Sequence, residues 1–230
     1  MVHPTLVRGD GKVLLCDTGY PGQTDQIERG LRAAGLGIDH LTGIVVTHHD
    51  HDHVGSLAAV RESSGGATVI ADATEADMID GSKPSARLLQ AVAYNETLTG
   101  DERERGEQFV EYLRTIEPCA VDRRLEETDE WIVPGLRIVR TPGHTPGHLS
   151  LFLEDTRVLI AGDALALDEG RLVIPNPEFA MDREKCIESV KAIRAMDVAR
   201  IVCYHGGAVE GDIPRLLDEL ISDWSPRQTT

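Results

Sequence analysis

Short apolar runs separated by polar, glycine-containing segments recur along most of the chain. Runs bounded by turn residues predict strands, and apolar positions three or four residues apart predict helices. The expected strands are Thr5–Val7, Lys12–Leu15, Gly43–Thr47, Ala67–Ala71, Trp131–Val133, Arg137–Arg140, Leu149–Leu153, Val158–Ile160 and Arg200–Tyr204. The expected helices are Asp25–Ala34, Val54–Arg61, Asp182–Met196 and Ile213–Ser222. Strands in groups with helices between the groups predict an α+β fold.

Residues 74 to about 117 follow a different, helical pattern. Thr74 and Asp77 resemble a helix-capping start. Apolar side chains then recur at helical spacing, at Leu88, Leu89 and Val92 and at Phe109, Tyr112, Leu113 and Ile116. We expect a helical insertion within a single domain spanning residues 1–230. It would cover a site and determine substrate specificity, or form a homodimer contact, or do both.

The composition narrows the classes of partner. The chain has 230 residues, with 39 acidic and 23 basic side chains, and its formal net charge is -16. This charge repels phosphate backbones, so we expect no nucleic-acid partner. No apolar run approaches the roughly 20 residues of a membrane span, so we expect no membrane partner. We expect a cytoplasmic protein, because Met1–Pro4 lacks a signal-peptide pattern and the four cysteines form no CxxC pair.

Histidines and aspartates follow four of the expected strands. Four of the nine histidines lie between residues 48 and 53. A second stretch, Thr141–His148, repeats Thr-Pro-Gly-His, and its Pro-Gly pairs predict tight turns. Asp163 and His205 each follow a further strand. Imidazole and carboxylate groups bind first-row metal ions, so these four strand ends predict one shared metal site.

The order of these motifs resembles the metallo-β-lactamase superfamily, and the repeated Thr-Pro-Gly-His is similar to its glyoxalase II-type hydrolases. The resemblance implies a four-layer αβ/βα sandwich with a binuclear site. The implied ligands are His48, Asp50 and His144 for one metal, Asp52, His53 and His205 for the other, and Asp163 as the bridge. The resemblance also implies that Asp17 orients the site by hydrogen bonding. We expect His148 to be structural. A shifted register with His49 and His51 as ligands stays open.

One position departs from the usual His-x-His-x-Asp-His signature, since Asp50 stands where the second histidine is expected. Three aspartates and a bridging hydroxide would cancel the charge of two divalent ions. Zinc is the most common ion in the family, but the extra carboxylate favours manganese or iron. We expect Asp50 to alter the metal preference of the first position or to weaken its binding.

The resemblance implies a hydrolase that uses a metal-bound hydroxide on a small carbonyl ester, thioester or lactone. Asp52 and Tyr204 are the candidate catalytic residues. The hydroxyl of Tyr204 would donate a hydrogen bond to the oxyanion, unless Tyr204 is only a buried aromatic residue. Two other functions stay open, an iron-dependent oxidoreductase or dioxygenase of the same fold and a non-catalytic metal-binding protein.

Overall fold

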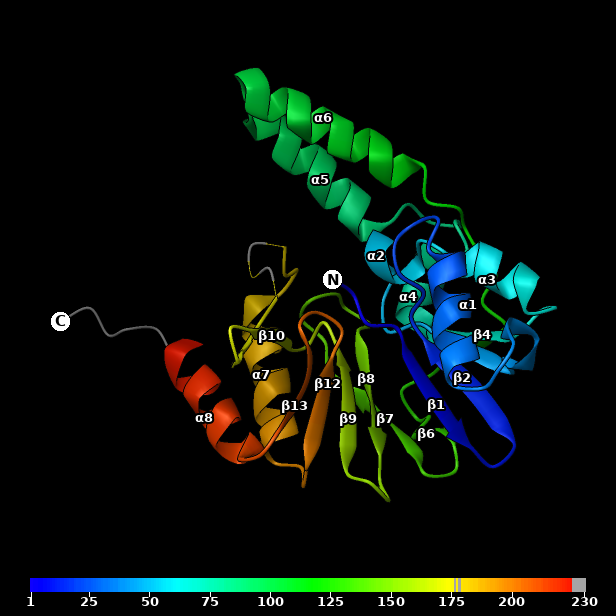
Figure 1. Cartoon of the computed structure of the whole chain (residues 1–230). Helices are drawn as coiled ribbons and strands as arrows, with labels where there is room; N and C mark the ends of the chain where they lie inside the picture. Colours follow the sequence, from blue (N-terminus) through cyan, green and yellow to red (C-terminus); the bar gives the residue numbers. More distant parts are fainter. Residues whose placement is uncertain (176, 178, 225–230) are drawn as a thin grey trace. The chain divides into compact units, whose positions relative to one another are not determined.

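The chain divides into two compact units. The computed structural model describes residues 1–175, 177 and 179–224 (Figure 1). The N-terminal unit is Leu6–Arg124, and the C-terminal unit combines Met1–Thr5 with Leu125–Thr230. The predicted single domain over residues 1–230 stays a prediction.

The N-terminal unit is built on a five-stranded sheet of order β1-β2-β3-β4-β5. Its strands are β1 (Thr5–Gly9), β2 (Lys12–Cys16), β3 (Gly43–Val45), β4 (Thr68–Asp72) and β5 (Arg123–Leu125). Alternate residues such as Leu15, Ile44 and Val69 form one core with the buried side chains of α1 (Thr24–Ala33) and α3 (Leu57–Ser63). Strands β2, β3 and β4 are parallel, so the residues that follow them come together at one edge of the sheet.

The predicted helical insertion consists of three helices, α4 (Ala73–Ile79), α5 (Ala86–Thr97) and α6 (Gly100–Arg114). Helices α5 and α6 lie side by side as a hairpin (Figure 1). The predicted capping start at Thr74 is wrong by two residues. Asp72 is the N-cap of α4, and its carboxylate accepts a hydrogen bond from the backbone nitrogen of Thr74 at 2.8 Å.

The predicted helix Val54–Arg61 is two helices, a short α2 (His51–Val54) and then α3. The interruption lies at Gly55, where the loop that carries Tyr20 and Pro21 approaches the backbone closely. A Cβ atom on Gly55 would lie 2.4 Å from the backbone nitrogen of Pro21. The helix also begins earlier than predicted, so the second half of the histidine motif is helical rather than extended.

The C-terminal unit is built on a six-stranded sheet of order β13-β12-β9-β8-β7-β6. Its strands are β6 (Trp131–Val133), β7 (Leu136–Arg140), β8 (Leu149–Leu153), β9 (Val158–Gly162), β12 (Arg200–Cys203) and β13 (Gly207–Glu210). Leu159 and Ile201 form one core with Val190 of α7 (Arg183–Arg194) and Leu217 of α8 (Ile213–Trp224). Strands β9 and β12 are parallel, so Asp163 and His205 follow strands that end at the same edge.

Most predicted elements are confirmed, and each unit is a helix layer on a sheet, as an α+β fold requires. Helix α7 begins where predicted, with Asp182 as its N-cap, whose carboxylate accepts a hydrogen bond from the backbone nitrogen of Lys185 at 3.0 Å. The sequence reading missed the short strands β5, β10 (Ala166–Asp168), β11 (Arg171–Val173) and β13 and the 3-10 helix Ile38–His40. Among the described residues, no helix combines the length and the apolar character that crossing a membrane would need.

Candidate metal centre

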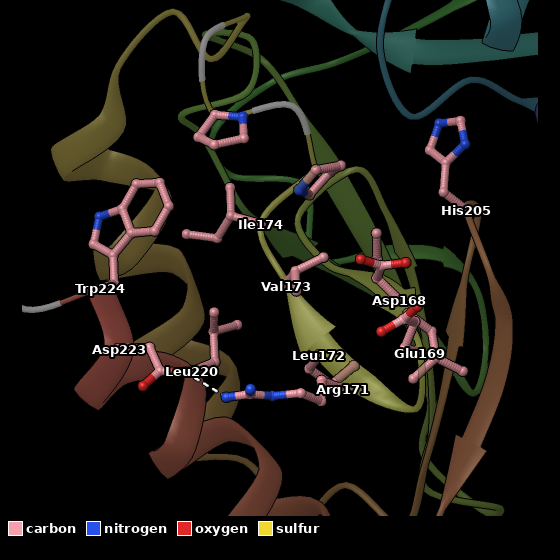
Figure 2. Close-up of a pocket in the computed structure, with 14 residues that line it drawn as sticks. Asp168, Glu169, Arg171, Leu172, Val173, Ile174, His205, Leu220, Asp223 and Trp224 are labelled. Atoms are coloured by element: carbon pink, nitrogen blue, oxygen red, sulfur yellow. Dashed lines mark hydrogen bonds and ion pairs between the residues drawn. The ribbon is translucent and has the colours of Figure 1, made fainter.

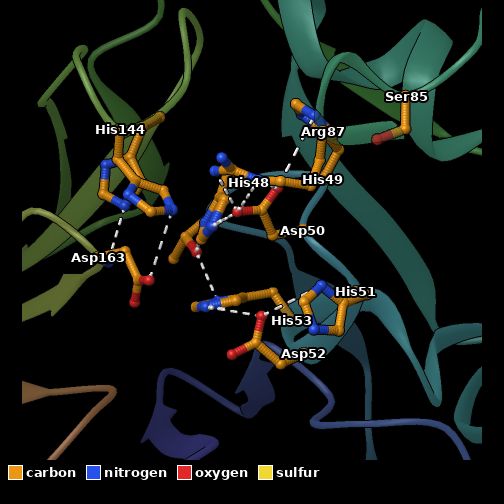
Figure 3. A network of polar contacts seen from close by, with 12 residues as sticks. His48, His49, Asp50, His51, Asp52, His53, Ser85, Arg87, His144 and Asp163 are labelled. Atoms are coloured by element: carbon orange, nitrogen blue, oxygen red, sulfur yellow. Dashed lines mark hydrogen bonds and ion pairs between the residues drawn. The ribbon is translucent and has the colours of Figure 1, made fainter. Parts of the chain in front are cut away.

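The N-terminal unit gathers four of the predicted ligands at the end of β3 and in α2 (Figure 3). The rings of His48 and His53 lie with centroids 4.0 Å apart. The Nε2 atom of His48 is 3.4 Å from Oδ2 of Asp50, and Nε2 of His53 is 4.0 Å from Oδ1 of Asp52. All four side chains are buried. The motif therefore places two imidazole nitrogens and two carboxylates in one small polar region.

Asp17 and Thr47 fix the orientation of both histidine rings. Asp17 follows β2 and accepts hydrogen bonds from the backbone nitrogen of Thr47 and from its hydroxyl, both at 2.8 Å. The same carboxylate lies 2.9 Å from Nδ1 of His53, and the hydroxyl of Thr47 lies 3.1 Å from Nδ1 of His48. A carboxylate only accepts, so Nδ1 of His53 donates, and Thr47, having donated to Asp17, accepts from His48. Both Nε2 atoms then carry a lone pair that can bind a metal.

His49 and His51, the ligands of the shifted register, have other contacts. Nδ1 of His49 pairs with the carboxylate of Glu75 in α4, and both side chains are fully buried. Burial alone would lower the pKa of His49, but the adjacent Glu75 raises it above its ordinary value. His51 packs between aromatic rings, and its burial lowers its pKa. These contacts favour the register with His48 and His53 as ligands.

Arg87, near the start of α5, forms a buried ion pair with Asp50 (Figure 3). Its Nε atom is 3.0 Å from both carboxylate oxygens, and its Nη2 atom is 2.6 Å from Oδ2. The side chain also donates to Gln90 through Nη1. Arg87 is 3% exposed and Asp50 is 5% exposed, so the pair is shielded from solvent. The insertion thus reaches the residue that departs from the family signature.

Three aromatic rings lie around His51, that of Tyr20 in the loop after β2 and those of Phe109 and Tyr112 in α6. We call these three side chains and His51 the aromatic group. The ring centroids of Tyr20, Phe109 and Tyr112 lie 5.7, 5.6 and 5.4 Å from that of His51. Nδ1 of His51 lies 4.0 Å from Oδ1 of Asp52. Burial and then the charge of Asp52 raise the pKa of Tyr112. The insertion therefore also contributes apolar surface beside a predicted ligand.

In the C-terminal unit, the loop Thr141–His148 between β7 and β8 is held by packing against α7. Gly143 has a φ of +137°, and a Cβ atom there would lie 2.4 Å from the backbone nitrogen of Cys186. Only glycine fits at this close approach. The carbonyl of Gly143 also accepts from the backbone nitrogen of Asp182, and that of His144 accepts from Met181. These contacts fix the backbone that carries His144.

Asp163 lies between the two histidines that the C-terminal unit contributes. Its Oδ2 atom is 3.6 Å from Nε2 of His144 and 3.4 Å from Nε2 of His205. His144 and Asp163 are buried, whereas the side chain of His205 is 26% exposed. Three ligand-type atoms from three separate loops therefore meet within this unit, and Figure 3 shows the contact between His144 and Asp163.

His148 has the structural position that was expected for it. Its Nε2 atom accepts a hydrogen bond from the backbone nitrogen of Asp163 at 2.9 Å. Because Nε2 is the acceptor, Nδ1 carries the proton of the neutral ring and donates to the hydroxyl of Thr141 at 2.8 Å. His148 therefore ties the loop after β7 to the loop that carries Asp163.

Tyr204 is 4% exposed, and its ring centroid lies 5.3 Å from that of His205 in an edge contact. Its predicted part in catalysis stays a prediction. The four cysteines are free and buried. Burial raises the pKa of Cys186 to about 11 and that of Cys203 to about 12, so these thiols are protonated at neutral pH.

A pocket of about 800 Å³ lies beside His205 in the C-terminal unit (Figure 2). Strands β10 and β11 and the end of α8 line it, and Arg171 pairs with Asp223 at 2.6 Å within it. The sequence did not predict this pocket, because β10 and β11 are only three residues long and are too short to show a clear alternation of apolar and polar residues. Its size suits a small organic molecule.

The spacing of the ligand-type atoms fits metal binding within each unit. Two donor atoms about 2.1 Å from one ion in tetrahedral geometry are about 3.4 Å apart. This matches the distance between His48 and Asp50, and that between Asp163 and His205. The donor set of imidazole nitrogen and carboxylate oxygen suits zinc, iron or manganese.

The sequence analysis did not predict three side chains that contact the histidine motif, namely Thr47, Glu75 and Arg87. Thr47 precedes the motif directly, so its position after a buried strand was a usable signal. Glu75 and Arg87 lie 26 and 37 residues beyond the side chains they contact. A single sequence holds no signal for such distant partners.

Comparison with known proteins identifies the family. A model of the metallo-beta-lactamase superfamily matches residues 1–205. The "Beta-lactamase-like protein 2 homolog" of Caenorhabditis elegans is 25% identical over 225 residues, which cover 97% of this chain and 62% of that protein. This chain thus spans less than two thirds of that relative's length. The "Probable metallo-hydrolase YflN" of Bacillus subtilis (strain 168) is 26% identical, with 91% of this chain and 83% of the relative covered.

A further relative and a solved structure agree with this result. An "N-acyl homoserine lactonase" of Bacillus thuringiensis is 26% identical over 175 residues, which cover 75% of this chain and 57% of that protein. The crystal structure of a metallo-beta-lactamase family protein from Thermus thermophilus, TTHA1429, matches with a TM-score of 0.71 at 23% identity. That match covers 95% of this chain and 72% of the other, and it confirms the α+β fold. The chain, with its variant histidine motif, belongs to the metallo-β-lactamase superfamily.

Proposed function

We propose that this protein is a metal-dependent hydrolase. The proposed ligands are His48, Asp50 and His144 for one divalent ion, Asp52, His53 and His205 for the other, and Asp163 for both. The observation that carries this proposal is the 3.4 Å spacing of ligand-type atoms within each unit, combined with histidine rings whose Nδ1 atoms are hydrogen-bonded. Membership of the superfamily supports the assignment of these residues as metal ligands.

Divalent ions bound there would supply an activated water molecule and a Lewis acid for a carbonyl oxygen. The chain's own residues hold and orient the ligands. Asp17 and Thr47 keep the Nε2 lone pairs of His48 and His53 available, and His148 fixes the loop of Asp163. The proposed role of Tyr204 is to donate a hydrogen bond to the developing oxyanion.

We propose a small ester, thioester or lactone as the substrate. The aromatic group lies beside Asp52 and offers apolar ring faces to the acyl part of such a molecule. The net charge of -16 opposes a polyanionic substrate. The lactonase among the relatives makes lactones the first class to test.

The test combines metal analysis with a hydrolysis panel. The protein is purified without added metal, loaded separately with zinc, manganese or iron(II), and assayed on lactones, thioesters, aryl esters and β-lactams. We expect hydrolysis of at least one class, lost on chelation and restored by metal. His53→Ala should abolish it, whereas the matched control at the exposed His40, His40→Ala, should not.

Two results would contradict the proposal. One is inactivity on every substrate class with every metal, in protein that binds metal. The other is iron-dependent oxygen consumption without hydrolysis, which would favour the oxidoreductase alternative.

A further inference from the structure

We propose that Asp50 and Arg87 together replace the second histidine of the family motif, with Arg87 as the positioning residue that sets the charge and direction of Asp50. This inference rests on the proposed metal centre and deepens it. It concerns two residues of the N-terminal unit, whose side chains form a buried ion pair.

The geometry makes Arg87 an orienting group rather than a loose counterion. Its guanidinium donates through two nitrogens to the carboxylate, at 3.0 Å from Nε and 2.6 Å from Nη2. Such a fork fixes the plane of a carboxylate as well as its position. The oxygen that accepts from Nη2 is also the one 3.4 Å from Nε2 of His48. A carboxylate oxygen has lone pairs for both a hydrogen bond and a metal ion.

Arg87 is itself held in place, as a positioning residue requires. It is the second residue of α5, whose N-cap Ser85 accepts a hydrogen bond from the backbone nitrogen of Leu88. Gln90, one helical turn further on, accepts a hydrogen bond from Nη1. Only 3% of Arg87 is exposed, so rotation of its guanidinium into solvent is blocked by packing.

The charges of the pair explain why both residues are needed. A histidine at position 50 would be a neutral ligand, whereas Asp50 adds one negative charge. The guanidinium adds one positive charge at contact distance. The pair therefore has the same net charge as the histidine it replaces. Burial strengthens this coupling, because a charge left alone in the interior is strongly destabilising.

The consequence is that changing Asp50 to histidine, which restores the family signature, does not restore the family site. Asp50→His removes the carboxylate to which Arg87 donates through two nitrogens, and with it this counter-charge to a buried guanidinium beside the position of a metal cation. Arg87→Met removes these two donors and their positive charge from the carboxylate of Asp50. Changing both residues removes the guanidinium and the carboxylate together. The double variant should therefore bind metal better than either single variant.

The experiment is a double-mutant cycle on the full chain, with zinc as the probe. The wild type, Asp50→His, Arg87→Met and Asp50→His/Arg87→Met are stripped of metal. Dissociation constants are then measured by competition with a chromophoric chelator, and unfolding is followed in the metal-free state. We expect each single change to weaken the more loosely held zinc ion by about tenfold or more. The double variant should bind that ion within about threefold of the wild type.

Matched variants distinguish this positioning role from a general loss of stability. Arg61→Met removes another arginine–aspartate pair of the same unit, between Arg61 and Asp122, and should leave zinc binding unchanged. Arg87→Lys keeps the charge but loses the fork, so it should recover part of the affinity lost in Arg87→Met. If Asp50→His fails to fold while the double variant folds, the coupling is supported. If both fail to fold, Asp50→Asn and Arg87→Lys replace them in the cycle.

The outcomes distinguish this inference from the proposed function. Two results would overturn the role of Arg87 and leave the proposed metal centre untouched. One is additive losses of zinc affinity in either cycle. The other is an Asp50→His variant that binds two zinc ions as tightly as the double variant does. A wild-type protein that binds no zinc, manganese or iron would overturn the proposed metal centre, and the inference with it.

Discussion

Replacing Asp17 with asparagine tests whether one buried carboxylate sets the tautomers of two histidines that are proposed to bind metal. Asparagine has nearly the same shape, and it adopts the left-handed backbone that Asp17 has, with φ of +61°. Alanine at this position would add backbone strain and confuse the result. The substitution therefore changes the hydrogen bonds and leaves the chain path alone.

The expected magnitude follows from the contacts of Asp17. Its Oδ2 accepts from Nδ1 of His53 at 2.9 Å and from the hydroxyl of Thr47 at 2.8 Å. An amide nitrogen in that place donates instead, so His53 must accept at Nδ1 and carry its proton on Nε2, where it blocks a metal. Loss of such a supporting group costs about 10–100-fold in metal affinity, or about 1.4–2.7 kcal/mol. The metal-free protein should lose about 1.5–3 kcal/mol, the value of one hydrogen bond to a charged group.

The assay is zinc competition against a chromophoric chelator, with urea unfolding of the metal-free protein measured in parallel. Thr47→Val removes the hydroxyl that orients His48 and should give a smaller loss of affinity than Asp17→Asn. Asp122→Asn is the control, because Asp122 bonds Val69 and Arg61 and should affect stability only. Asp17→Asn with the zinc affinity of the wild type would refute the reasoning.

Three further predictions concern other parts of the chain. Gly143→Ala should lower the free energy of unfolding by about 2–4 kcal/mol, because its Cβ atom overlaps backbone atoms of α7, and thermal unfolding measures this. Hydrogen bonds from Lys83 and Arg124 lower the pKa of Asp77 to about 2, from an ordinary 3.8. The carboxylate of Asp77 therefore stabilises the fold fully above its ordinary pKa of 3.8, and this stabilisation is lost as the pH falls through about 2. In this acid range, the free energy of unfolding of Asp77→Asn should fall less steeply with decreasing pH than that of the wild type. If the insertion forms a homodimer, Leu89→Glu on the exposed face of α5 should yield a monomer in light scattering, and an unchanged mass would contradict that contact.

The long apolar runs made most of the fold predictable from the sequence. Strands such as Leu149–Leu153 are nearly continuous apolar runs because both of their faces are buried. The three-residue strands β10 and β11 gave too little pattern for such a reading. The break at Gly55 was missed because it depends on the approach of Pro21, more than thirty residues earlier in the chain.

The candidate ligands could be proposed from the sequence because their motifs follow strands, and strand ends are fixed by backbone pairing that the sequence pattern reveals. Their role as ligands stays a prediction. His148 could be separated from the ligands only through its hydrogen bonds to Asp163 and Thr141. The resemblance to the metallo-β-lactamase superfamily is confirmed. The family motif does not specify the metal, the number of ions or the substrate.

Arg87 changes what the departure at position 50 means. Counted from the sequence, three aspartates and a hydroxide cancel the charge of two divalent ions, which favours a harder ion and a poorly activated water. With Arg87 at 2.6 Å from Asp50, one positive charge returns to the immediate surroundings of the site. The charge argument for manganese or iron is then offset, and only the oxygen ligand itself still favours them. The metal preference should therefore follow the geometry that Arg87 imposes on Asp50 more than the charge of Asp50, and for this reason position 50 cannot be interpreted without position 87.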